Sequence, residues 1–237
     1  MESRIFYPSY ILTAFKKLLP FLGMTFGIVL GTIVIALLLS ILIVKGRLSK
    51  NKIAVKIASG YVGALRCTPS IVLLFIVFYG LPRLFLAFGI DLNFWPKAFF
   101  VIVALSLLYA ASLSEVIRSA YLAVGKGQYE AAVSVGLTEF QAIRRIVFPQ
   151  AFVVALPNLG NSLVSLLKEG SLAYTIGLID VMGAGNLLIS RNMGAYAIET
   201  YVALALIYWI ATIILENFFK FIEKKFLKLS KKDHVIP

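Results

Sequence analysis

The stretch LPFLGMTFGIVLGTIVIALLLSILIV, residues 19–44, contains no charged side chain. An α-helix rises about 1.5 Å per residue, so a helix of this length exceeds the roughly 30 Å of a bilayer's hydrocarbon layer. The run is also longer than the apolar part of a signal peptide, and no obvious small-residue cleavage site follows it. It therefore predicts a membrane span that is kept as the first span of the chain.

Four further apolar stretches predict spans, at about residues 67–86, 96–116, 148–167 and 196–219. The whole chain is 60% hydrophobic and 14% charged, whereas soluble domains are about 45–50% apolar and about 25% charged. We expect an all-α polytopic membrane protein with about five transmembrane helices. Residues 1–237 are expected to form one transmembrane domain.

The charged residues predict how the chain is oriented. Its net charge is +12, with the lysines and arginines placed between the apolar runs. Segments 45–56, 118–150 and 220–237 hold 15 of them, and the alternate segments hold 7. Because cytoplasmic loops carry the excess of Lys and Arg, the N-terminus is expected outside and the C-terminus in the cytoplasm. Membrane orientation explains the charge better than nucleic-acid binding does.

The sequence contains few residues that could form a catalytic or metal-binding site. Cys67 is its only cysteine and His234 its only histidine, so an internal disulfide, a thiolate metal cluster and a histidine metal site are not expected. There is no GxSxG nucleophile elbow and no GxxxxGK[ST] phosphate loop in the sequence. We expect no catalytic residue, metal or cofactor, and an intramembrane enzyme is a weaker alternative.

The segment GKGQYEAAVSVGLTEFQAIRRIVFPQA, residues 125–151, is neither apolar span nor polar coil. Good helix formers at 128–135 predict a first short helix, and Gly136 permits a chain reversal after it. Thr138 is the expected N-cap of a second helix, and Pro149 either ends that helix or starts the next. The pattern predicts a helical hairpin on the cytoplasmic side.

The spacing in this hairpin resembles the EAA signature of bacterial ATP-binding-cassette importer permeases. The matching positions are Glu130, Ala131, Ala132, Gly136, Ile146, Phe148 and Pro149, with Phe148 where the family usually has leucine. The resemblance implies that a coupling loop at about 119–150 docks on cassette ATPase subunits, which hydrolyse the ATP. Glu130 would be the polar contact, Ala131 and Ala132 the close-packing surface, and Gly136 the turn. A channel that works without ATP would leave this hairpin unexplained.

Three segments, residues 66–82, 114–132 and 157–177, resemble one branch of this family, the permeases for polar amino acids. This resemblance implies a single permease domain in a bacterial cell membrane, an extracytoplasmic amino-acid-binding protein, and a second permease copy or paralogue. Relatives carry a Glu and an Asp in the last segment that contribute to a site for cationic amino acids, and Ser162 and Glu169 stand there in this chain. Seven residues apart, these two share one face of an unbroken helix.

The loss of one carboxylate at Ser162 weakens selection for Lys- or Arg-like substrates. The pair Asn161-Ser162 and the stretch IYWIAT at 207–212 look more like cystine permeases. The expected cargo is therefore L-cystine or a related sulfur amino acid, with glutamine, glutamate or arginine as alternatives.

Ionisable residues in the apolar stretches leave two interpretations open. Lys168 and Glu169 are either a pair at the interfacial end of a span, or Glu169 meets a substrate ammonium group, with Ser171 beside it in the pathway. Glu115 and Arg118, three residues apart, are either an internal ion pair or part of a gate or substrate path. The segment from Arg66 to Pro69 is expected to start a helix.

Overall fold

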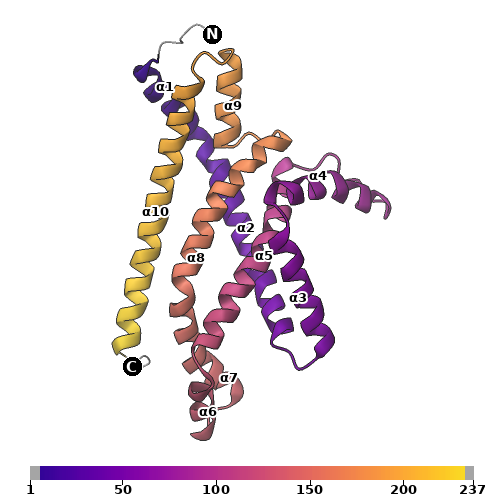
Figure 1. Ribbon diagram of the computed structural model, residues 1–237, viewed down its shortest axis with the longest axis vertical. Coiled ribbons are helices and arrows are strands. Elements are labelled where there is room, and N and C mark those ends of the chain that lie inside the picture. The colour runs from indigo at the N-terminus through magenta and orange to yellow at the C-terminus, as the bar shows by residue number, and fades with distance from the viewer. Residues whose placement is uncertain (1–5, 233–237) are drawn as a thin grey trace. The chain divides into compact units, whose positions relative to one another are not determined.

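The structure is a computed structural model that describes residues 6–232, and every regular element in this range is helical (Figure 1). The α-helices are α1 (Pro8–Leu18), α2 (Leu22–Arg47), α3 (Lys52–Cys67), α4 (Ser70–Leu86), α5 (Lys97–Ala123), α6 (Lys126–Ser134), α7 (Glu139–Ala142), α8 (Phe148–Gly170), α9 (Val181–Arg191) and α10 (Ala197–Lys232). Three short segments link them: the 3-10 turns η1 (Leu19–Phe21) and η3 (Ser171–Ile176), and the π turn η2 (Ile143–Val147).

Four helical runs are long and apolar enough to cross a membrane: Pro8–Arg47, Lys97–Ala123, Glu139–Ile176 and Ala197–Phe226. They match four of the five predicted spans, two of them beginning one residue later than predicted, and each run extends beyond the predicted C-terminal end. The all-α membrane class is thereby confirmed.

The second predicted span differs from the structure. Cys67 was expected to open it, but Cys67 ends α3, and α4 begins only at Ser70. Pro69 disfavours a helical conformation in the residue before it, which explains the break between the two helices. Taken together as one broken span, α3 and α4 bring the number of candidate spans to five.

The described chain forms two compact units. One contains residues 6–35, 68–108 and 165–213, and the other contains residues 36–67, 109–164 and 214–232. Helices α2, α5, α8 and α10 each contribute to both units.

The first unit has a core where α1, α9 and the first half of α10 meet. Leu18 of α1, Val181 of α9 and Leu204 of α10 are buried together there. Helix α9 was not anticipated from the sequence. A Cβ added at Gly185 would lie 2.6 Å from Leu204 Cδ1, so the glycine lets α9 lie close to this side chain of α10. A Cβ added at Gly183 would lie 2.4 Å from the carbonyl oxygen of Leu178.

A buried polar cluster starts α9 in the same unit. Asp180 is the N-cap, and its carboxylate accepts a hydrogen bond from the Gly183 N–H at 2.9 Å. The Thr25 hydroxyl of α2 donates to Asp180 at 3.4 Å and accepts from the Val181 N–H at 3.2 Å. Burial raises the pKa of the Asp180 carboxyl, whereas the hydrogen bonds that it accepts from Gly183 and Thr25 lower this pKa. The cluster fixes α2 against the beginning of α9.

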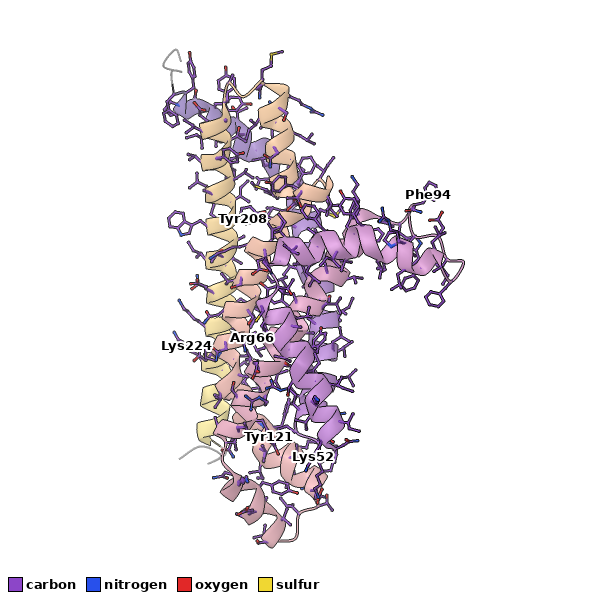
Figure 2. The ribbon with its side chains drawn as sticks, turned by 45° about the vertical axis from the view of Figure 1, so that its right-hand side comes forward. Lys52, Arg66, Phe94, Tyr121, Tyr208 and Lys224 are labelled. Atoms are coloured by element: carbon purple, nitrogen blue, oxygen red, sulfur yellow. The ribbon has the colours of Figure 1, made fainter. Side chains whose placement is uncertain are left out.

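The second unit carries the predicted hairpin and two close helix contacts. A Cβ added at Gly46 of α2 would lie 3.2 Å from the Ala58 Cβ of α3, and one added at Gly160 of α8 would lie 3.1 Å from the Phe219 ring of α10. Lys52 and Arg66 mark the two ends of α3 in Figure 2.

Candidate functional site

The predicted hairpin is present in the second unit, formed by α6 and α7 between the end of α5 and the start of α8 (Figure 1). Gly136 reverses the chain with a φ of +90°, a conformation that side chains other than glycine rarely adopt. Thr138 caps α7, since the Gln141 N–H donates to its hydroxyl at 3.3 Å and the Thr138 N–H donates to the Gln141 side chain at 3.0 Å. This reciprocal capping box confirms Thr138 as the N-cap, and the positive φ of Gly136 confirms the turn there.

The signature residues divide between the surface and the interior of the hairpin. Glu130 and Ala131 are exposed, whereas Ala132 is 6% exposed. Both alanines were expected to face a partner, but Ala132 lies inward because α6 packs on η2 and α7. Glu130 borders a pocket of about 310 Å³ with Tyr129 and Lys126. Of the EAA triplet, only Glu130 and Ala131 are on the surface.

Apolar side chains also lie on the outside of this hairpin. Val135 is 80% exposed, Phe140 is 69% exposed and Phe148 is 60% exposed. Ile146 and Pro149 are half-buried.

Pro149 starts a helix rather than ending one, as the second residue of α8. It has no N–H, and its ring would clash with the carbonyl of Arg145 in a regular α-turn. The preceding turn is a π turn, in which the Phe148 N–H donates to the Ile143 carbonyl five residues back. The wider turn accommodates the proline without interrupting the run from α7 into α8.

Glu169 in the first unit is held by a residue that the sequence did not point to. The hydroxyl of Ser70, the first residue of α4, donates to Glu169 Oε2 at 2.7 Å. Glu169 is half-buried, and among the described residues no lysine or arginine nitrogen lies within 4.0 Å of its carboxylate. Lys168 is exposed, so the adjacent Lys168–Glu169 pair does not form. The carboxylate is therefore open to a cationic group.

Two other predicted residues, Ser162 of α8 and Ser171 of η3, bond to backbone carbonyls three or four residues earlier in the chain. The Ser162 hydroxyl donates to the Asn158 carbonyl at 2.8 Å, and the Ser171 hydroxyl donates to the Lys168 carbonyl at 2.6 Å. Asn161 is exposed. Such bonds to the preceding turn occupy the hydroxyl proton but leave the oxygen able to accept.

Glu115 in the second unit holds three guanidinium groups. Arg118 donates two hydrogen bonds to Glu115 Oε2, each at 3.1 Å, which confirms the predicted internal pair. Arg47 of α2 donates to Glu115 Oε1, and the Arg66 Nη1 lies 3.8 Å from the same oxygen. Neither Arg47 nor Arg66 was predicted as a partner. The sequence did hold a hint of these contacts. Glu115 is the acidic residue of an apolar stretch, and Arg47 and Arg66 lie near the ends of two other helices.

Known proteins with similar sequences are membrane components of transport systems. Residues 33–228 match the family model described as binding-protein-dependent transport system inner membrane component. The chain is 39% identical over 207 residues to the L-cystine transport system permease protein TcyL of Bacillus subtilis, covering 87% of this chain and 82% of that protein. It is 36% identical over 205 residues to the arginine transport system permease protein ArtQ of the same organism, covering 86% and 90%.

Solved structures give the same result. A crystal structure of an amino acid ABC transporter with histidines matches with a TM-score of 0.80 and 28% identity, covering 93% of this chain and 99% of that chain. The MetNI methionine ABC transporter in an inward-facing conformation shares the fold, with a TM-score of 0.65, 20% identity and coverage of 91% and 95%. The chain thus belongs to the binding-protein-dependent transport system inner membrane components, as the permease subunit of an amino acid ABC importer.

Proposed function

We propose that the cargo of this permease is L-cystine or a related sulfur amino acid, and that Glu169 receives one α-ammonium group of the cargo. The observation that carries the proposal is the half-buried Glu169 carboxylate, which is oriented by the Ser70 hydroxyl and has no cationic partner among the described residues. A single carboxylate at this place suits one α-ammonium group of an amino acid without net charge, such as cystine, whose two ammonium groups are balanced by its own two carboxylates.

The position of Ser162 supports the choice of a substrate without a cationic side chain. A serine oxygen can accept a hydrogen bond but supplies no charge, so a guanidinium or ε-ammonium group would lack a counter-ion there. Two relatives are L-cystine permeases, at 39% and 34% identity, but an arginine permease is 36% identical. Overall identity does not separate these cargoes, and the proposal depends on residues 162 and 169. Glutamine, glutamate and arginine are the alternatives.

The hairpin is proposed as the contact with the cassette ATPase. Glu130 and Ala131 are exposed beside the apolar side chains of Val135 and Phe140. Apolar side chains that protrude from a polar segment outside the membrane mark an interaction surface. A short helix that lays a small-residue face into a groove loses little side-chain entropy. ATP binding to two such subunits would move both hairpins and switch the pathway between outward-open and inward-open states.

The remaining parts of the complex follow from this assignment. The N-terminus is proposed outside and the C-terminus in the cytoplasm, since segments 45–56, 118–150 and 220–237 hold 15 of the 23 lysines and arginines. An extracytoplasmic binding protein delivers the amino acid, and a second copy of this chain or a paralogue completes the pathway.

Uptake by the reconstituted complex tests the cargo. The chain, its cassette ATPase and its binding protein are placed in vesicles, and ATP-dependent uptake of labelled cystine, arginine, glutamine and glutamate is compared. Saturable cystine uptake in excess of the others supports the proposal. Preferential arginine uptake overturns the role given to Ser162, and a lack of ATP-dependent uptake of all four contradicts the whole assignment.

A substitution at position 162 tests the charge argument directly. Ser162→Glu adds the carboxylate that the chain lacks and is expected to raise the ratio of arginine to cystine uptake about tenfold. Ser162→Gln has nearly the same size without the charge and serves as the matched control. An equal change in both variants would mean that side-chain volume, not charge, decides the selectivity.

A further inference from the structure

A polar pocket of about 450 Å³ lies beside the Glu115 cluster in the second unit. Arg47 of α2 and Glu115 of α5 form part of its lining. The rest comes from one face of α3, which includes Ser59, Gly63 and Arg66. Arg66 is labelled in Figure 2. A Cβ added at Gly63 would meet no atom within 4 Å, so the glycine leaves open space there.

The pocket carries more positive than negative charge. Arg47, Arg66 and Arg118 share the single carboxylate of Glu115, and no other described carboxylate lies within 4.0 Å of their nitrogens. Arginine stays protonated in proteins, so the three arginines and Glu115 keep two uncompensated positive charges, and the pocket lining, with Arg47, Arg66 and Glu115, keeps one.

Arg66 is the member of the cluster that is free to bind something else. Its side chain is 55% exposed and lies 3.8 Å from Glu115, whereas the Arg47 side chain is 15% exposed and in direct contact with that carboxylate. A guanidinium presents parallel N–H groups that match two oxygens of a carboxylate or phosphate.

The outer surface of the same helix is suited to lipid. Ile53 and Ile57 of α3 are 70% and 69% exposed, and Lys52 and Lys56 beside them are also exposed. A helix with exposed isoleucines and lysines is typical of the boundary between headgroups and acyl chains. An occupant of the pocket is therefore expected to come from the bilayer.

We propose that this pocket binds the phosphodiester of an anionic phospholipid, with Arg66 as its main ligand and Arg47 behind it. A zwitterionic amino acid fits less well, because its ammonium group would meet surplus positive charge and Glu115 is already engaged by Arg47 and Arg118. Basic pockets between membrane helices recognise such headgroups through the same charge complementarity. The proposal does not depend on which amino acid the complex transports.

Cys67 provides a direct probe, since it is the only cysteine of the chain, is exposed, and lines the pocket. The full chain is placed in nanodiscs of phosphatidylcholine with or without phosphatidylglycerol, and the rate of Cys67 labelling by an uncharged maleimide is measured. Bound phosphatidylglycerol is expected to slow labelling several-fold. Equal rates in the two kinds of nanodisc would overturn the proposal.

Two variants separate a specific site from a general surface effect. Arg66→Gln is expected to weaken the protection of Cys67 about fivefold, because this is the effect on affinity of one arginine beside an anionic lipid. Gly63→Leu fills the pocket without changing its charge, and its labelling ratio with and without phosphatidylglycerol should approach one. Gly60→Leu is the matched control, because Gly60 is also in α3 and also faces open space but does not line the pocket. Equal protection in all three variants would refute the pocket as the binding site.

A final experiment determines whether the occupant of the pocket is a lipid or a soluble anion. Inorganic phosphate and glycerol phosphate are added to phosphatidylcholine nanodiscs in place of phosphatidylglycerol. No protection is expected from either, since the membrane supplies the occupant at high local concentration. If a soluble phosphate protected Cys67 from labelling as well as phosphatidylglycerol does, the proposal of a lipid site would be wrong and the pocket would be assigned to a soluble phosphate. Native mass spectrometry of the purified chain gives a second readout, in which retained phosphatidylglycerol should fall in Arg66→Gln and Gly63→Leu but not in Gly60→Leu.

Discussion

Glu115 and Glu169 are carboxylates in apolar helices, yet they have opposite surroundings. Glu115 is enclosed by guanidiniums from α2, α3 and α5. Glu169 accepts one hydrogen bond from the neutral Ser70 hydroxyl and has no cation within ion-pair distance among the described residues. A carboxylate that is saturated with protein cations supports the fold, whereas one that is held in place but not neutralised is available to a ligand. The difference predicts that losing Glu115 lowers stability and losing Glu169 lowers transport.

Removing the Glu115 carboxylate is expected to have the largest effect. Glu115→Gln leaves Arg47 mostly buried without its counter-ion, and breaking a buried pair in this way costs about 3 kcal/mol. The unfolding transition of the purified chain in detergent measures the loss. Glu216→Gln is the control, since it breaks an exposed i,i+4 pair with Lys220 that is worth at most about 0.5 kcal/mol. Equal stabilities of the two variants would remove the structural role assigned to Glu115.

Neutralising Glu169 is expected to affect transport and leave stability nearly unchanged. Glu169→Gln keeps an oxygen that accepts from Ser70, but the charge for a substrate ammonium is lost, which lowers initial uptake about tenfold. Lys168→Gln, at the adjacent exposed position, should retain uptake. A melting temperature that falls in Glu169→Gln as much as in Glu115→Gln would erase the distinction between the two carboxylates.

Removing the Ser70 hydroxyl tests whether orientation of Glu169 matters. Ser70→Ala deletes one hydrogen bond to a charged group, and a loss of about 1 kcal/mol is expected in substrate binding, seen as a raised KM for uptake at an unchanged maximal rate. Ser119→Ala, which removes an exposed hydroxyl that donates to the Val116 carbonyl of its own helix, is the comparison. An unchanged KM in Ser70→Ala would show that Glu169 needs no support.

A small effect on stability is expected from Arg66→Gln. The Arg66 side chain is half exposed and sits at the limit of ion-pair distance from Glu115, so its removal should change stability by no more than about 0.5 kcal/mol. Unfolding of Arg66→Gln and Glu115→Gln under the same conditions checks the ranking. A large loss in Arg66→Gln would mean that all three arginines hold Glu115 equally.

Glu130 offers a test of the hairpin that is independent of both carboxylates. Glu130→Lys is expected to abolish co-purification of the cassette ATPase while the chain still inserts in the membrane. Glu139→Lys makes the same change of charge at another exposed position of the hairpin and should retain the partner. Loss of the partner in both variants would point to the net charge of the hairpin, not to Glu130.

Features that depend on neighbours in sequence could be predicted. Gly136, Thr138 and the Glu115–Arg118 pair all involve residues at most four positions apart, where backbone conformation alone sets the geometry. Lys168 and Glu169 show the limit of that reasoning, because adjacent residues on a helix point in different directions and their opposite charges do not pair.

Partners distant in sequence could not be predicted. Ser70 lies 99 residues from Glu169, and Arg47 lies 68 residues from Glu115. Hydropathy identified the long apolar helices but placed Cys67 at the start of a span instead of at the end of α3. Pro69 was the local sign of this break, and averaged hydropathy does not register a single proline.

The two glycines at the start of α9 differ in how replaceable they are. A methyl group at Gly185 would meet the end of the Leu204 side chain, which can rotate aside or be shortened by a second substitution. A methyl group at Gly183 would meet the Leu178 carbonyl oxygen at 2.4 Å, and a backbone atom cannot be moved by any change of side chain. In a survey of all single and double substitutions, position 185 would therefore show compensating partners and position 183 would show none. Both glycines are buried in the same helix, but only one of them can be exchanged during evolution in two steps.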